Sequence, residues 1–163
     1  MKKILILGSN GMLGHMVNYY FSSITSYQTY TINSRWPEKF FKDSVTNFWK
    51  KLDGDFIINC IGAIHQRSEV FDVNVDLPIW LDKNINSKFS NCKIIHPGTD
   101  CESDNDEYGI SKREAADYII NHGSVTKIIK TSIIGPELNS ESSLFEWFLN
   151  NKEKTIQGYN SFL

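Results

Sequence analysis

Short runs of apolar residues alternate with longer stretches in which apolar and polar residues recur at helical spacing. The short runs predict strands and the longer stretches predict helices, because a strand of a parallel sheet is apolar on both faces whereas a surface helix is apolar on one. The predicted strands are 3–7, 28–32, 56–60, 93–96, 127–131 and 155–157, and the predicted helices are 12–22, 44–52, 70–85, 111–121 and 143–150.

This alternation predicts an α/β domain built on a doubly wound parallel sheet with helices on both faces. The chain has 163 residues, which fits a single domain over 1–163. Pro78 falls inside the helical pattern of 70–85. That helix is therefore predicted to begin near Asp76 or to kink at the proline.

Composition places the chain among ordinary globular proteins, with 40% hydrophobic and 22% charged residues and a net charge of −2. So small a net charge gives no broad attraction to nucleic acid or to an anionic membrane. The apolar run 4–7 is too short for an export signal, and no stretch approaches the roughly 20 apolar residues of a membrane span. The three cysteines have no metal or redox spacing, which fits reduced thiols in a cytoplasmic protein.

A glycine-rich turn directly after the first predicted strand is the most informative feature of the sequence. Gly8, Gly11 and Gly14 recur every third residue where the next helix is predicted to begin. Such a turn can bind a pyrophosphate, because glycines let the backbone approach it and a helix N-terminus offers unpaired N–H groups. The spacing is G-x-x-G-x-x-G rather than the G-x-G-x-x-G of the general dinucleotide fingerprint, so a tight turn without a ligand stays an alternative.

The residues after the second and third strands are further candidates, because ligands of doubly wound sheets bind at the carboxyl ends of strands. No acidic residue follows the second strand to bind a ribose 2′-hydroxyl, whereas Arg35 could pair with a 2′-phosphate. This favours NADP(H) over NAD(H), with a solvated loop arginine as the alternative. The small apolar segment 59–63 follows the third strand and could pack beside an adenosine or simply end the strand.

Thr99, Tyr108 and Lys112 follow the fourth predicted strand. Tyr108 and Lys112 are four residues apart and therefore share one face of a helix. A lysine ammonium near a phenol lowers the phenol pKa and makes it a usable acid or base near neutrality, and Thr99 could bind the same reacting oxygen. A Tyr-x-x-x-Lys pair also arises by chance on solvated helices, so its weight comes from its place after the glycine turn and the threonine.

In this order the segments resemble the extended short-chain dehydrogenase/reductase family, and most closely its dTDP-4-dehydrorhamnose reductase branch. The resemblance implies a Rossmann-type fold that binds NADPH or NADH and reduces a 4-keto-6-deoxy sugar linked to a nucleoside diphosphate. The segments that carry it are ILILGSNGMLG (4–14), INCIG (58–62), VNVDLP (73–78), HPGTDC (96–101), YGISK (108–112) and KTSIIG (130–135).

The resemblance also implies roles for individual residues. Tyr108 would donate a proton to the C4 carbonyl oxygen while the nicotinamide delivers hydride to C4. Lys112 would lower the pKa of Tyr108 and bind the nicotinamide ribose, and Thr99 would hydrogen-bond the developing alkoxide. The implied cofactor contacts are Gly8, Asn10, Gly11, Met12, Leu13, Gly14, Arg35, Cys60, Ile61, Gly62, Tyr108 and Lys112.

Two departures from the family keep other interpretations open. The segment between Thr99 and Tyr108 is shorter than the family's, and Leu163 falls near where family members build most of the sugar-nucleotide pocket. Either the protein is a reduced homologue, or segments of a longer protein are missing from the sequence. The second is favoured, because an enzyme without both pieces would have little to hold its nucleotide-sugar substrate. The C-terminal substrate-binding portion is therefore expected to lie largely outside 1–163.

Two other functions fit parts of the same pattern. One is a non-catalytic NADP-binding subunit that regulates a partner enzyme, as the reductase-like subunit of methionine adenosyltransferase does. The intact Thr99, Tyr108 and Lys112 argue against it, and the missing substrate half argues for it. The other is a sugar-nucleotide epimerase or dehydratase, for which Asp100 beside Thr99 is weak support. A homodimer is one open state of assembly.

Overall fold

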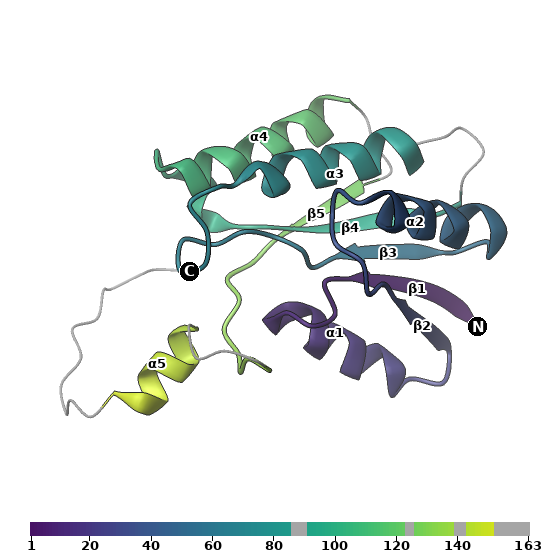
Figure 1. The fold of residues 1–163 in the computed structure, drawn as a ribbon, viewed down its shortest axis with the longest axis horizontal. Coiled ribbons are helices and arrows are strands. Elements are labelled where there is room, and N and C mark those ends of the chain that lie inside the picture. Colours follow the sequence, from purple (N-terminus) through teal and green to yellow (C-terminus); the bar gives the residue numbers. More distant parts are fainter. Residues whose placement is uncertain (86–90, 123–125, 139–142, 152–163) are drawn as a thin grey trace.

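The five strands of the described chain form one parallel sheet in the order β2-β1-β3-β4-β5 (Figure 1). The computed structural model describes residues 1–85, 91–122, 126–138 and 143–151. The predicted Rossmann-type sheet is confirmed, and the strand predicted at 155–157 lies outside the described residues. The strands are β1 (Lys2–Leu7), β2 (Tyr27–Thr31), β3 (Phe56–Asn59), β4 (Lys93–Gly98) and β5 (Thr126–Lys130).

The helices fall where the pattern predicts them, but two of them begin earlier. The helix predicted from Ser44 begins at Lys39, and the helix predicted from Ser111 begins at Glu107, directly after its N-cap Asp106. The elements are α1 (Met12–Ser22), α2 (Lys39–Lys51), α3 (Asp72–Ile85), the 3₁₀ turn η1 (Asp100–Ser103), α4 (Glu107–Asn121) and α5 (Leu144–Asn150).

Helix α3 corrects the prediction made from its proline. It begins at Asp72 and continues through Pro78, so a start near Asp76 is wrong. Pro78 is buried together with Leu77 and Leu81 on the face that packs against the sheet. Packing of this apolar face outweighs the one backbone hydrogen bond that the proline cannot donate.

The two faces of the sheet are covered unequally. Helices α2 and α3 pack on one face, where alternate strand residues such as Leu5, Ile57 and Ile94 are buried against Phe41 and Leu81. On the other face α1 packs over a smaller cluster. In Figure 1, α3 and α4 lie together on the side of the sheet opposite α1. That smaller cluster consists of Ile4, Ile6 and Ile58, with Val17, Phe21, Tyr27, Phe56, Cys60 and Ile95 packed against it.

The strand order changes direction between β1 and β3. The connection after β1 leads to β2 on one side, and the later connections lead to β3, β4 and β5 on the other. Leu7 pairs with Asn59, so the two adjacent strands end level with each other. The loops that follow β1 and β3 therefore diverge from a common edge, which is where doubly wound sheets bind their ligands.

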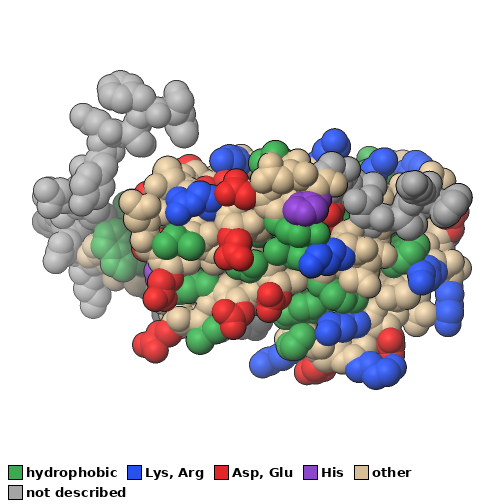
Figure 2. Space-filling model, turned by 90° about the horizontal axis from the view of Figure 1, so that it is seen from above, with side chains coloured by type: hydrophobic (Ala, Val, Ile, Leu, Met, Phe, Trp, Pro, Cys, Tyr) green, Lys and Arg blue, Asp and Glu red, His purple; other side chains and the backbone are tan. Residues whose placement is uncertain are grey.

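Acidic and basic side chains are distributed unequally over the surface of α3 and α4. Figure 2 shows most acidic side chains of this face towards one end and most basic ones towards the other. A shallow groove lies at the N-terminal parts of the two helices, lined by Glu69, Val70, Phe71, Asp72, Val75, Glu107, Ile110, Ser111 and Glu114. Within the described part of the chain, no helix has the length and apolar character needed to cross a membrane.

Candidate active site

The turn after β1 packs so closely that two of its glycines cannot carry a side chain. Gly8 has φ +75°, a left-handed conformation that favours glycine. A Cβ on Gly14 would lie 2.0 Å from the carbonyl oxygen of Gly8, so helix α1 begins directly against the turn. Gly11 is different, because a Cβ there would meet that oxygen at 3.4 Å and be accommodated. Gly11 is the N-cap of α1, beside the unpaired N–H groups at the beginning of that helix.

The same turn lies against the residues that follow β3. A Cβ on Gly8 would lie 2.9 Å from both the carbonyl oxygen of Cys60 and Cγ1 of Ile61. The backbone N–H of Cys60 donates to Leu7 at 3.0 Å, which continues the pairing of β3 with β1. The structure thus brings the glycine turn together with Cys60 and Ile61, two of the cofactor contacts that the resemblance implies. Burial raises the pKa of the Cys60 thiol to about 12, so this sulfur is a neutral packing group.

The residues after β2 fit one end of a dinucleotide. Arg35 is exposed in the loop that follows this edge strand, four residues after the strand ends at Thr31. The hydroxyl of the neighbouring Ser34 is buried and has no hydrogen-bond partner among the described residues. A buried hydroxyl without a partner is costly, and a ribose or phosphate oxygen would supply one. Together with the close turn at Gly8, this hydroxyl fits a nicotinamide dinucleotide at this edge.

Thr99 directly follows β4 and is held by the turn η1. Its Oγ1 accepts a hydrogen bond from the N–H of Cys101 at 3.3 Å and donates to Asp100 at 3.2 Å. In return, the Glu102 carboxylate accepts the N–H of Thr99 at 3.2 Å, which completes a capping box. Thr-x-x-Glu is the sequence signature of that motif, so η1 was predictable although it was not predicted.

Tyr108 lies in the first turn of α4 and is half-buried, with its phenol beside the Thr99 side chain. Its phenol pKa is raised above the ordinary value of 10.0, first by burial and also by the ionisable groups of Cys101, Asp100 and Asp106, while the neighbouring Thr99 side chain acts in the opposite direction. The sequence predicted a pKa lowered by Lys112. The structure shows the reverse, because the surrounding acidic groups and burial favour the neutral phenol.

Lys112 is buried one turn after Tyr108, and its ammonium donates to the carbonyl oxygen of Pro97 at 3.0 Å. Burial lowers the pKa of this lysine, and the nearby Glu102 carboxylate opposes the shift. The Glu102 carboxylate also pairs with Lys130 of β5 at 2.7 Å. Thr99, Tyr108 and Lys112 therefore do come together at the end of β4, with the lysine anchored to the strand.

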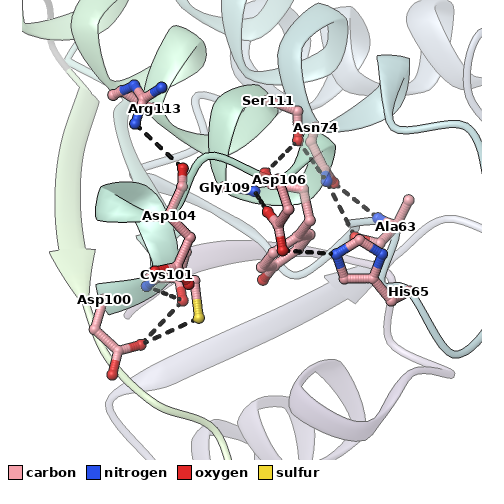
Figure 3. Close-up of polar contacts among 12 residues, drawn as sticks. Ala63, His65, Asn74, Asp100, Cys101, Asp104, Asp106, Gly109, Ser111 and Arg113 are labelled. Carbon is pink, nitrogen blue, oxygen red and sulfur yellow. Dashed lines mark hydrogen bonds and ion pairs between the residues drawn. The ribbon is translucent and has the colours of Figure 1, made fainter.

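Several polar residues around this site were not singled out from the sequence. Asn59 Nδ2 donates to Nδ1 of His96 at 3.2 Å and joins the ends of β3 and β4. Burial lowers the pKa of His96 to about 3, with the charge of Lys112 adding to the effect, so its imidazole is neutral. Asn74 of α3 is hydrogen-bonded to Ala63 in the loop after β3, and His65 of that loop is hydrogen-bonded to Asp106 at the N-cap of α4 (Figure 3). Their partners lie 11 and 41 residues away in the sequence, and no local sequence pattern predicts such contacts.

Comparisons with known proteins extend these findings at the level of the fold. No protein-family model and no curated protein sequence matches the chain. Among solved structures, a short-chain dehydrogenase family protein from Francisella tularensis aligns with a TM-score of 0.63 at 14% identity, over 91% of this chain and 74% of that one. A dTDP-4-dehydrorhamnose reductase from Clostridium acetobutylicum aligns with a TM-score of 0.62 at 20% identity, over 91% of this chain.

A dTDP-4-dehydrorhamnose reductase from Bacillus anthracis in complex with NADP aligns with a TM-score of 0.57 at 16% identity, over 86% of this chain. The chain spans 58% of the Clostridium reductase and 57% of the Bacillus reductase, less than two thirds of either. The fold is thus that of short-chain dehydrogenase/reductase proteins, and the resemblance stated from the sequence is found again in the structure.

Proposed function

We propose that this chain binds NAD(P)H and catalyses reduction of a 4-keto-6-deoxy sugar linked to a nucleoside diphosphate, with Tyr108 as the proton donor. The observation that carries the proposal is the convergence of Thr99, Tyr108 and Lys112 at the end of β4, two strands from the glycine turn. The fold-level similarity to dTDP-4-dehydrorhamnose reductases, one of them in complex with NADP, supports it.

The cofactor would lie along the carboxyl edge of the sheet. Gly8, Gly11 and the beginning of α1 would hold its pyrophosphate, because the glycines let a phosphate approach the backbone and the N–H groups in the first turn of α1 have no partner within the helix. Arg35 and Ser34 would bind the ribose next to the adenine, with Arg35 favouring a 2′-phosphate and therefore NADPH. When bound, the nicotinamide supplies the hydride.

The residues after β4 would donate the proton and stabilise the developing negative charge. The Tyr108 phenol is neutral near pH 7, since its pKa lies above the ordinary value of 10.0, and it carries the proton that a carbonyl oxygen needs on reduction. Thr99 would turn its hydroxyl from Asp100 to that oxygen and stabilise the alkoxide. Lys112 would bind the nicotinamide ribose and, as a cation one helical turn away, stabilise the phenolate that forms.

The proposal is tested by adding NADPH and NADH separately to this chain and following binding by nicotinamide fluorescence. A dTDP-4-keto-6-deoxy sugar is then added and oxidation of the nicotinamide is followed by its absorbance. Tyr108→Phe is expected to bind NADPH like the wild type and to lose turnover, because the phenyl ring has no proton to donate. Full turnover by Tyr108→Phe would rule out the proposed acid, and binding without turnover by the wild type would favour the regulatory subunit.

A further inference from the structure

We propose that His65 is a positioning residue, which fixes the ring of Tyr108 by bridging the loop after β3 to the beginning of α4. This inference rests on the proposed function, because it concerns the residue to which that function assigns the proton. Neither the sequence pattern nor the comparisons with solved structures assign a role to His65. Its bridge is built from one hydrogen bond and two ring contacts.

The hydrogen bond joins His65 to the N-cap of the helix that carries Tyr108. His65 Nε2 lies 3.1 Å from one carboxylate oxygen of Asp106, whose other oxygen accepts the N–H of Gly109 at 2.6 Å. The pKa of Asp106 is lowered, first by the Gly109 bond and also by His65. Because an ionised carboxylate can only accept, Nε2 must carry a proton and donate it. His65 thereby helps to fix the carboxylate of Asp106, the N-cap residue of α4.

The ring of the same histidine lies against Tyr108. The centroids of the His65 and Tyr108 rings are 5.6 Å apart at an interplanar angle of 56°. Phe71 contacts both, edge-on to His65 at 5.0 Å and to Tyr108 at 6.0 Å. These separations are typical of favourable aromatic contacts. Tyr108 is thus held between the rings of His65 and Phe71.

The loop that carries His65 is itself anchored to the same helix. Asn74 of α3 exchanges two hydrogen bonds with the backbone of Ala63, accepting at 2.8 Å and donating at 3.0 Å (Figure 3). Asn74 also donates to the hydroxyl of Ser111 at 3.2 Å, and that hydroxyl donates to the carbonyl oxygen of Tyr108 at 2.7 Å. The backbone of Tyr108 is therefore held through Ser111 and its ring through His65. Both routes begin in the loop after β3.

A surface ion pair without a functional role is the alternative. The side chains of His65 and Asp106 are 50% and 48% exposed, and exposed pairs of this kind contribute little to stability. The two interpretations differ in what the loss of the bond changes. A surface pair affects at most the melting temperature, whereas a positioning residue affects kcat while cofactor affinity stays the same.

The test uses two amide substitutions that differ only in length. In His65→Gln the amide nitrogen reaches the place of Nε2 and can still donate to Asp106, whereas in His65→Asn it reaches only the place of Nδ1. We expect His65→Asn to lower kcat roughly tenfold, since small misplacements of reacting groups cost about that much or more. His65→Gln keeps the bond to Asp106 but not the ring contact with Tyr108, so it should recover part of this loss. His122→Gln is the matched control, because His122 lies at the opposite end of α4.

A second measurement does not depend on turnover. Ring-to-ring NMR cross-peaks between Phe71 and Tyr108, assigned with Tyr108→Phe, report directly whether the tyrosine ring keeps its place. They should persist in His65→Gln and in the control, and weaken in His65→Asn. Unchanged cross-peaks and a kcat within twofold of wild type in His65→Asn would overturn the proposal. If the wild type shows no turnover, the proposed function fails and the cross-peaks alone decide the role of His65.

Discussion

Replacing Gly14 by alanine tests the packing of the glycine turn. The added Cβ would lie 2.0 Å from the carbonyl oxygen of Gly8 and 2.6 Å from its carbon. Both atoms belong to the backbone, so no side-chain rotation relieves the overlap, and α1 must move away from the turn by about 1 Å to reach even the shortest real contacts.

The expected cost follows from opposing effects. Overpacking of this kind typically lowers the free energy of unfolding by about 1–3 kcal/mol. Alanine in place of glycine inside a helix raises it by roughly 1 kcal/mol. The backbone clash places Gly14→Ala at the upper end, so we expect a net loss of about 2 kcal/mol. For a chain of this size that corresponds to a fall in Tm of roughly 4–8 °C, measured by circular dichroism.

Gly11→Thr is the matched variant, because it adds a larger side chain at a position with room. Its Cβ would meet the oxygen of Gly8 at 3.4 Å, and threonine caps a helix about as well as glycine. We expect Tm to stay within about 2 °C of wild type, since the cap is preserved, and NADPH affinity to fall because the side chain occupies the phosphate's approach. A Gly14→Ala protein as stable as wild type would refute the packing argument. Unchanged NADPH affinity in Gly11→Thr would refute the phosphate site.

Two buried titratable groups give predictions of opposite sign. Burial raises the pKa of Asp82, against the hydrogen bond that it accepts from Thr126 at 2.7 Å, so its ionised form opposes folding. Asp82→Asn keeps that acceptor and should be more stable than wild type at pH 8. Its advantage in Tm should shrink as the pH falls through the raised pKa of Asp82. Tm values equal to those of wild type at both high and low pH would contradict this. Burial lowers the pKa of His96 from 6.5 to about 3, so the unfolded chain binds the extra proton and stability is lost as the pH falls from about 6.5 towards 3. Denaturant unfolding at successive pH values should show a weaker dependence for His96→Gln, and an unchanged dependence would exclude the neutral histidine as its source.

The strands and their order along the chain were predictable, because the spacing of apolar residues within each short segment indicates a buried strand. Helix beginnings were less so, and α4 shows why. The apolar pattern supports a helix only from Ser111, whereas the structure begins it at Glu107 because the carboxylate of Asp106 accepts the N–H of Gly109. An aspartate placed before a helix is a known signal of an N-cap, so this boundary could have been found.

The candidate site likewise has features that local sequence predicts and features that only the folded structure shows. Tyr108 and Lys112 were predictable because their spacing places them on one helix face, and so was the glycine turn. The pKa of Tyr108 was not, since it depends on burial and on acidic groups contributed by η1 and the N-cap of α4. The His65–Asp106 and Asn59–His96 contacts join residues 41 and 37 positions apart, and only the folded sheet brings them together.

The hydrogen bond from Lys112 to Pro97 sets the spacing between two parts of the site. Pro97 lies two residues before Thr99 on the strand, and Lys112 lies four residues after Tyr108 on the helix. This one hydrogen bond therefore limits how far α4 can shift relative to the end of β4, and with that shift the separation of the Thr99 and Tyr108 hydroxyls. Ala115 and Ala116 are buried further along the same helix. A larger side chain at either alanine would need room that the packed helix does not have, so it would shift α4 and change the separation of the two hydroxyls without replacing any residue of the site.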